Sequence, residues 1–133
     1  MEEKYNIPCL IDDVETEANL QLDEDNCRIL FELGNYSIAI EAENYFYALL
    51  ELRRKLEPLN VKVLCKGACR YVYPSPMILS MGDAIKAYRL TLGKQASLSD
   101  LVNIFEPCEP NEYASIDEQL AYYQEWKRSR QSI

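Results

Sequence analysis

Two neighbouring segments, at residues 27–33 and 36–42, alternate apolar with polar side chains. Alternation over this length predicts half-buried β-strands. Gly34 and Asn35 stand between the segments, and both tolerate the positive φ of a tight turn. The pattern therefore predicts a β-hairpin, whose inward side chains are Cys27, Ile29, Phe31 and Leu33 on one strand and Tyr36, Ile38, Ile40 and Ala42 on the other.

Two other segments carry a helical period. The first begins after Asn44, which can cap a helix, and ends before Pro58; its apolar face holds Tyr45, Leu49, Leu52 and Leu56. The second begins at Ser115 and Glu118, which match a capping box. Its apolar face holds Ile116, Leu120 and Tyr123, with Trp126 at the flank, and Lys127, Arg128 and Arg130 follow at the end that favours cations.

The remaining segments are expected to be short. Residues 1–26 suit a first strand or an irregular acidic arm laid on the core. The spacing predicts strands over 61–65, 68–73 and 85–92, a loop over 77–83 after two prolines, and either a short helix or an edge strand over 97–105. These elements predict one α+β domain over residues 1–133, with a mostly antiparallel sheet and two helices packed on one face.

Composition agrees with a folded chain. The 133 residues are 48% hydrophobic and 27% charged, enough to close one core. No apolar run approaches the roughly 20 residues that cross a bilayer, and the start Met1-Glu2-Glu3-Lys4 lacks the order of a secretory signal. Five cysteines, an odd number, indicate reduced thiols. We therefore expect a cytoplasmic protein that does not contact membranes.

Charge is divided into blocks along the chain. Residues 1–26 hold nine acids against one base, which equals the whole net charge of −8. Residues 53–94 hold nine bases against two acids, and residues 95–126 hold seven acids and no base. Such blocks either steer a charged partner or form solvated faces that keep the protein soluble.

Histidine is absent from the sequence. Its absence removes the usual Ser-His and Cys-His nucleophile pairs and the commonest metal ligand. Cys65 and Cys69 are separated by three residues rather than the two of redox and zinc motifs, and at that spacing both thiols can face the core of a strand. We therefore expect no catalytic residue, no metal and no cofactor.

Nucleic-acid binding is a further class to weigh. The basic block at 53–94 contains Tyr71, Tyr73 and Tyr88, which could stack on bases. A sequence pI of about 4.6 opposes this class, because nucleic-acid-binding domains are usually basic. No nucleic acid is expected as a partner.

The segment 71–83 combines two prolines with Met77, Met81 and Gly82, as a binding loop or a loop that plugs the sheet end would. The run Tyr73-Pro74-Ser75, then Met77, Met81-Gly82 and Lys86-Ala87-Tyr88-Arg89-Leu90 resembles a signature of small bacterial immunity proteins of contact-dependent growth inhibition and related polymorphic toxin systems. The resemblance covers about residues 61–106; Pro76 replaces a glycine of the signature, and Asp83 departs from its glycine-rich stretch.

The resemblance implies a protein that binds and neutralises a cognate toxin. Concentrated acidic charge would suit the basic cleft of a nuclease toxin. The candidate partner-binding residues are Asp12, Asp13, Glu15, Glu17, Asp23, Glu24, Asp25, Tyr73, Ser75, Met77 and Met81. Two other functions remain open: a non-catalytic adaptor or oligomerising domain, such as a homodimer formed through Tyr73–Met81, and a redox protein that uses Cys65 and Cys69.

Overall fold

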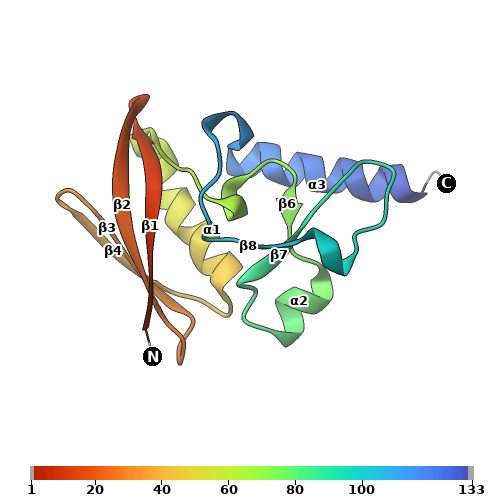
Figure 1. The fold of residues 1–133 in the computed structure, drawn as a ribbon, viewed down its shortest axis with the longest axis horizontal. Coiled ribbons are helices and arrows are strands. Elements are labelled where there is room, and N and C mark those ends of the chain that lie inside the picture. The colour runs from red at the N-terminus through yellow and green to blue at the C-terminus, as the bar shows by residue number, and fades with distance from the viewer. Residues whose placement is uncertain (1, 132–133) are drawn as a thin grey trace.

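A computed structural model describes residues 2–131 (Figure 1). Five strands form a curled antiparallel sheet in the order β4-β3-β2-β1-β5. They are β1 (Glu2–Ile11), β2 (Val14–Asp23), β3 (Arg28–Leu33), β4 (Tyr36–Glu41) and β5 (Val61–Val63). Helix α1 (Tyr45–Leu56) packs against β3, β4 and β5. The predicted hairpin is confirmed as β3 and β4, and Asn44 caps α1 as expected, because its side-chain oxygen accepts a hydrogen bond from the Tyr47 N–H at 2.8 Å.

The N-terminal segment forms two full strands, where the sequence analysis expected an arm or one strand. Ten residues of β1 pair with ten of β2, from Ile11 opposite Val14 to Glu2 opposite Asp23. The turn between them is Asp12-Asp13, with φ of 48° and 68°. Asp tolerates this left-handed region better than most residues, which explains a tight hairpin without glycine.

A second, three-stranded antiparallel sheet has the order β6-β7-β8. Its strands are β6 (Val72–Tyr73), β7 (Lys86–Arg89) and β8 (Leu101–Asn103). Helix α2 (Pro76–Met81) lies between β6 and β7 in the chain, and α3 (Ile116–Gln131) contacts both α1 and β6. Short 3-10 turns cover η1 (Glu57–Leu59), η2 (Lys66–Ala68), η3 (Leu98–Asp100) and η4 (Pro110–Glu112).

The loop expected at residues 77–83 is wrong, and the other short elements differ in extent from those expected, as β5 covers only Val61–Val63 of the strand expected at 61–65. Residues 68–73 are a strand only at Val72–Tyr73, because a 3-10 turn precedes it. Residues 77–83 are largely the helix α2, with Pro76 in its first turn and Ser75 as its cap. The strand expected at 85–92 is β7, and residues 97–105 contain both a 3-10 turn and the strand β8.

One cluster of buried apolar side chains runs through both sheets. Phe31 of the large sheet, Phe46 of α1 and Phe105 after β8 are each no more than 1% exposed. The rings of Tyr45 and Phe105 meet edge to face, with centroids 6.1 Å apart. The α+β class is confirmed. Within residues 2–131, no helix has the length and apolar content needed to span a bilayer.

Candidate functional site

The main pocket among the described residues has a volume of about 550 Å³. It lies between the β6–α2 connection, the end of β7 with the following loop, and the second half of α3. Ligand pockets commonly have roughly 300–1,000 Å³, so this one can admit one or two side chains of a partner or a small molecule. Its aromatic lining comprises Tyr73, Tyr88, Tyr123 and Trp126.

The aromatic wall is stacked and therefore rigid. The Tyr73 and Tyr123 rings lie 4.1 Å apart at 13°, and the Tyr123 and Trp126 rings lie 6.1 Å apart at 19°. Behind Tyr73, the buried ring of Phe46 makes an edge-on contact at 5.1 Å. Burial raises the pKa of the Tyr73 hydroxyl, which like any tyrosine is protonated at neutral pH and can donate a hydrogen bond.

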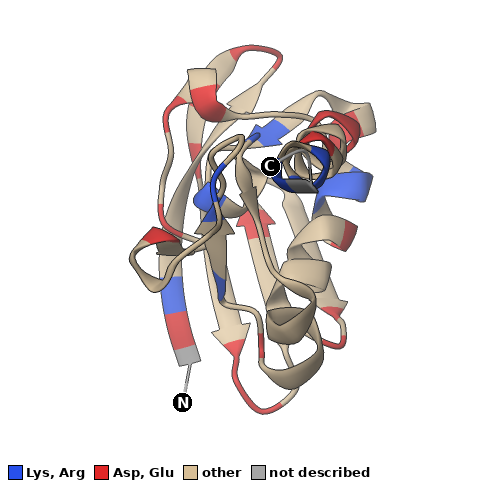
Figure 2. Ribbon diagram, turned by 90° about the vertical axis from the view of Figure 1, so that its right-hand side faces the viewer, with Lys and Arg blue, Asp and Glu red and all other residues tan. Residues whose placement is uncertain are grey.

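Two cations pack against this wall, and both residues line the pocket. The Lys127 ammonium lies 5.2 Å from the centroid of the Tyr123 ring, and the Arg130 guanidinium lies 4.5 Å from that of Trp126. Figure 2 shows basic residues on the turns of α3 near the C-terminus. No acidic side chain of the described residues lines the pocket. The Arg130 Nε is buried and has no hydrogen-bond partner among the described residues.

Hydrogen bonds to the loop after β7 hold the pocket half of α3 in place. Tyr122 donates to the Leu90 carbonyl at 3.2 Å, and the Trp126 indole donates to the Lys94 carbonyl at 2.9 Å. The Ser129 hydroxyl accepts the Gly93 N–H at 2.8 Å. These contacts occur at successive turns of α3, so the helix and the loop form one rigid rim.

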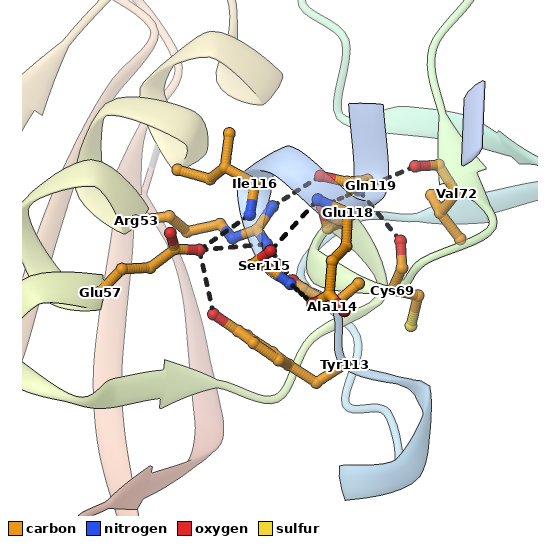
Figure 3. Close-up of polar contacts among 11 residues, drawn as sticks. Arg53, Glu57, Cys69, Val72, Tyr113, Ala114, Ser115, Ile116, Glu118 and Gln119 are labelled. Carbon is orange, nitrogen blue, oxygen red and sulfur yellow. Dashed lines mark hydrogen bonds and ion pairs between the residues drawn. The ribbon is translucent and has the colours of Figure 1, made fainter. Parts of the chain in front are cut away.

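A buried polar network anchors the N-terminal half of α3 (Figure 3). Arg53 of α1 is 1% exposed and donates to the Gln119 side chain at 2.6 Å and to the Ala114 carbonyl. The Gln119 amide nitrogen lies within 3.0 Å of three backbone oxygens, those of Gly67, Cys69 and Val72. The network therefore joins α1, η2 and β6 to the helix that supplies the pocket wall.

Glu57 completes this anchor from the end of α1. Its carboxylate accepts the Ile116 N–H at 2.9 Å, at the first turn of α3, and the Tyr113 hydroxyl at 3.3 Å. The Arg53 guanidinium lies 3.8 Å from the same carboxylate and 5.5 Å from the centre of the Tyr113 ring. Every part of this arrangement is paired except Arg53 Nε, so we interpret it as structural support.

The predicted site residues at 73–81 fall in two settings. Tyr73 and Ser75 line the pocket, and the Ser75 hydroxyl also accepts the Ile78 N–H at 3.1 Å as the cap of α2. Met77 and Met81 lie on α2 and are 69% and 81% exposed. The structure thus places an exposed apolar helix directly after the pocket wall.

The predicted acidic residues lie at two ends of the large sheet (Figure 1). Asp12, Asp13, Glu15 and Glu17 surround the β1–β2 turn, whereas Asp23, Glu24 and Asp25 belong to the β2–β3 turn. Because β2 has ten residues, at ~3.3 Å each the two turns are about 30 Å apart, and Glu17 and Asp23, the nearest members of the two groups along β2, are about 20 Å apart. Several also have local roles, since Asp12 accepts a hydrogen bond from Asn60 and Asp23 accepts the Asp25 N–H.

The paired cysteines considered for redox chemistry are both fully buried. Burial raises the pKa of the Cys65 thiol to about 12. A hydrogen bond with Cys108 and burial raise the pKa of Cys69 as well. Because the thiolate is the reactive form, this setting opposes rather than activates attack by either sulfur.

The sequence pattern did not predict the part of the pocket that α3 supplies. Tyr123, Trp126, Lys127 and Arg130 follow a spacing of three, four and seven residues along α3, which places them on one helical face. Aromatic and cationic residues sharing one face were the available signal. No protein-family model matches the chain, and a search of curated proteins found no match, so the fold and the site geometry are the basis for a functional proposal.

Proposed function

We propose that the chain is an immunity protein, a non-catalytic cytoplasmic protein that binds a cognate bacterial toxin and blocks its activity. The main support for this proposal is the position of the residues that carry the resemblance. Tyr73, Ser75 and Tyr88 line the pocket, while Met77 and Met81 are exposed on the adjoining helix. The resemblance therefore falls on one surface unit, β6–α2–β7, rather than on the core alone.

The exposed methionines support a protein partner. At 69% and 81% exposure, Met77 and Met81 contribute little to the core. Methionine is flexible and polarisable, and it is favoured at surfaces that adapt to another protein. An apolar helix provides a contact surface for a partner, and the adjoining pocket can receive one of the partner's side chains.

The chemistry of the pocket indicates which anchor would fit. Stacked aromatic rings favour a flat or apolar group, and the Lys127 and Arg130 cations favour negative charge. The pocket has no acidic lining residue among those described, so a carboxylate would meet no like charge there. We infer that the toxin inserts an acidic or aromatic side chain.

The acidic β1–β2 turn is the second contact in this proposal. The Asp13 side chain is 81% exposed, and Asp12, Glu15 and Glu17 lie close by in the same hairpin. A narrow acidic tip is suited to the basic cleft of a nuclease. Neutralising this group should slow association and weaken its salt dependence, while pocket variants should speed dissociation. If neutralising all the predicted acids leaves binding unchanged, the electrostatic part of the proposal is wrong.

The first experiment is co-expression with the product of the gene immediately upstream, measuring growth rescue and co-purification. Rescue with a stable complex would support the proposal, and a harmless neighbour that does not bind would contradict it. The pair Met77→Ser and Met81→Ser should weaken the complex at least tenfold. Leu59→Ser is the matched control, because Leu59 is also an exposed apolar residue, at 47%, but lies in η1.

The adaptor or homodimer alternative would use the same methionine surface. Sedimentation of the isolated protein at several concentrations distinguishes the two. A dimer that Met81→Ser dissociates, together with absence of toxin binding, would favour self-association over immunity.

A further inference from the structure

Three potential metal ligands that are far apart in the sequence come together next to the 3-10 turns η2 and η4. The sulfur atoms of Cys69 and Cys108 and a carboxylate oxygen of Glu112 all lie within 4.8 Å of one another. The sequence spacing had pointed to Cys65 as the partner of Cys69. In the folded chain the Cys65 thiol is absent from this group, and Cys108 takes its place beside Cys69.

Backbone hydrogen bonds hold all three ligand residues in position. The N–H groups of Cys69, Cys108 and Glu112 donate to the carbonyls of Lys66 at 3.1 Å, Leu64 at 3.0 Å and Glu109 at 3.0 Å, respectively. The Glu112 carbonyl in turn accepts the Arg70 N–H at 3.0 Å. The three side chains therefore meet on a fixed frame, which lowers the entropic cost of binding an ion.

A second set of contacts orients the carboxylate. The Tyr71 hydroxyl donates to Glu112 Oε2, and the Glu109 N–H donates to Glu112 Oε1 at 2.9 Å. The Arg89 guanidinium packs 5.1 Å from the centre of the Tyr71 ring. Hydrogen bonds of this kind behind a ligating carboxylate are a regular feature of protein metal sites.

We propose that Cys69, Cys108 and Glu112 bind one Zn²⁺ ion. Two thiolates and one carboxylate form a ligand set that zinc accepts, with a fourth position for water. Zn–S bonds of ~2.3 Å and Zn–O bonds of ~2.0–2.2 Å in a tetrahedron place ligand atoms roughly 3.5–3.8 Å apart, so side-chain shifts of about 1 Å complete the site. On binding, each thiol loses its proton to solvent and the sulfur lone pair forms the bond to zinc.

Burial favours one stable site over a loosely held surface ion. Cys69 is fully buried and Cys108 is 9% exposed, while Glu112 is half-buried. Zinc would link η2, the segment after β8 and η4. The ion would tie these three segments together and keep an open fourth position for water, independently of the pocket and of toxin binding.

The test uses the full chain and Zn²⁺ alone. Purified protein is incubated with excess Zn²⁺, desalted and analysed for metal content, and affinity is measured against a chromogenic chelator. We expect about one zinc per chain, loss of the ion in Cys108→Ser, and roughly 10–100-fold weaker binding in Tyr71→Phe, which removes only the supporting hydrogen bond. Cys27→Ser is the matched control and should bind as the unmodified chain does, because Cys27 lies in the β2–β3 turn.

A cobalt substitution provides a readout that does not depend on a variant folding. Co²⁺ bound by two thiolates should produce a sulfur-to-metal charge-transfer band, which Zn²⁺ then abolishes. Protein that binds less than about a tenth of an equivalent of zinc and shows no such band would overturn the proposal, since a preformed Cys₂Glu set should hold zinc. A Cys69–Cys108 disulfide in protein purified without reductant would also overturn it.

Discussion

Gln119→Leu is the substitution that most directly tests the anchor of α3. Gln119 is 1% exposed, accepts a hydrogen bond from Arg53, and lies within hydrogen-bond distance of three backbone carbonyls. Leucine has a similar size and a similar helix propensity, so neither a large cavity nor a helix effect complicates the result. What changes is the pairing of buried polar groups.

The expected loss follows from the groups left unpaired. Arg53 Nη1 belongs to a guanidinium that is 1% exposed, and a buried charged donor left without its hydrogen-bond partner costs about 1–3 kcal/mol or more. Each of the three backbone carbonyls that lose the Gln119 amide contributes at most about 1 kcal/mol, because some of them keep backbone partners. The contact between Arg53 and Glu57 at 3.8 Å offsets part of the loss at the guanidinium. We expect the free energy of unfolding to fall by about 3–5 kcal/mol.

Urea unfolding followed by tryptophan fluorescence measures this change, since Trp126 lies on the same helix. Gln124→Leu is the matched control, because Gln124 is exposed on α3 and its loss should change stability by at most about 0.5 kcal/mol. Arg53→Met combined with Gln119→Leu should cost less than the sum of the single changes, because the double variant leaves no buried charge unpaired. A Gln119→Leu loss below about 1 kcal/mol, or strictly additive costs, would show that the pairing of Gln119 with Arg53 does not stabilise the fold.

Three further outcomes follow from individual side chains. Gly67→Ala should destabilise the protein by about 1–3 kcal/mol in thermal unfolding, because the new methyl group would lie 2.5 Å from Leu49 Cδ2; Gly82→Ala, with its nearest contact at 3.6 Å, should be close to neutral. The urea midpoint of unfolding should fall as the pH rises above 9. Burial raises the pKa of the Cys65 thiol from 9.0 to about 12, so in this range the folded state keeps a proton that the unfolded state loses. A midpoint that stays constant up to pH 10.5 would contradict this. Iodoacetamide at pH 8 should label the half-buried Cys27 before the other cysteines, as peptide mass spectrometry can show.

Several elements of the fold could be predicted because their signals are local. The hairpin of β3 and β4 has uninterrupted alternation and a Gly-Asn turn, and α1 has a cap, a regular apolar face and a proline after its end. The β1–β2 hairpin was less clear. Pro8 interrupts its pattern and acidic residues crowd its turn, although Ala18, Leu20 and Leu22 still alternate inward.

The helix α2 shows a local signal that was overlooked. Ser75 followed by Pro76 is a favourable start for a helix, but two prolines and only six helical residues resemble a loop in sequence. Four of the eleven predicted site residues lie in or beside this segment. The structure retains Tyr73 and Ser75 in the pocket and moves Met77 and Met81 onto an exposed helix beside it.

The rest was decided by contacts between distant residues. Residues 68–73 have the composition of a strand, yet Gln119, about fifty positions later, binds the carbonyls of Cys69 and Val72, and Gly67 lies close against Leu49 and Ile104. The pocket likewise joins residues 73–76, 88–96 and 123–130. Periodicity and capping are encoded over one or two turns of chain, so the sequence alone determined the class and most elements. Which buried faces meet depends on side-chain shape and on polar pairing across the core, and only the tertiary structure decided it.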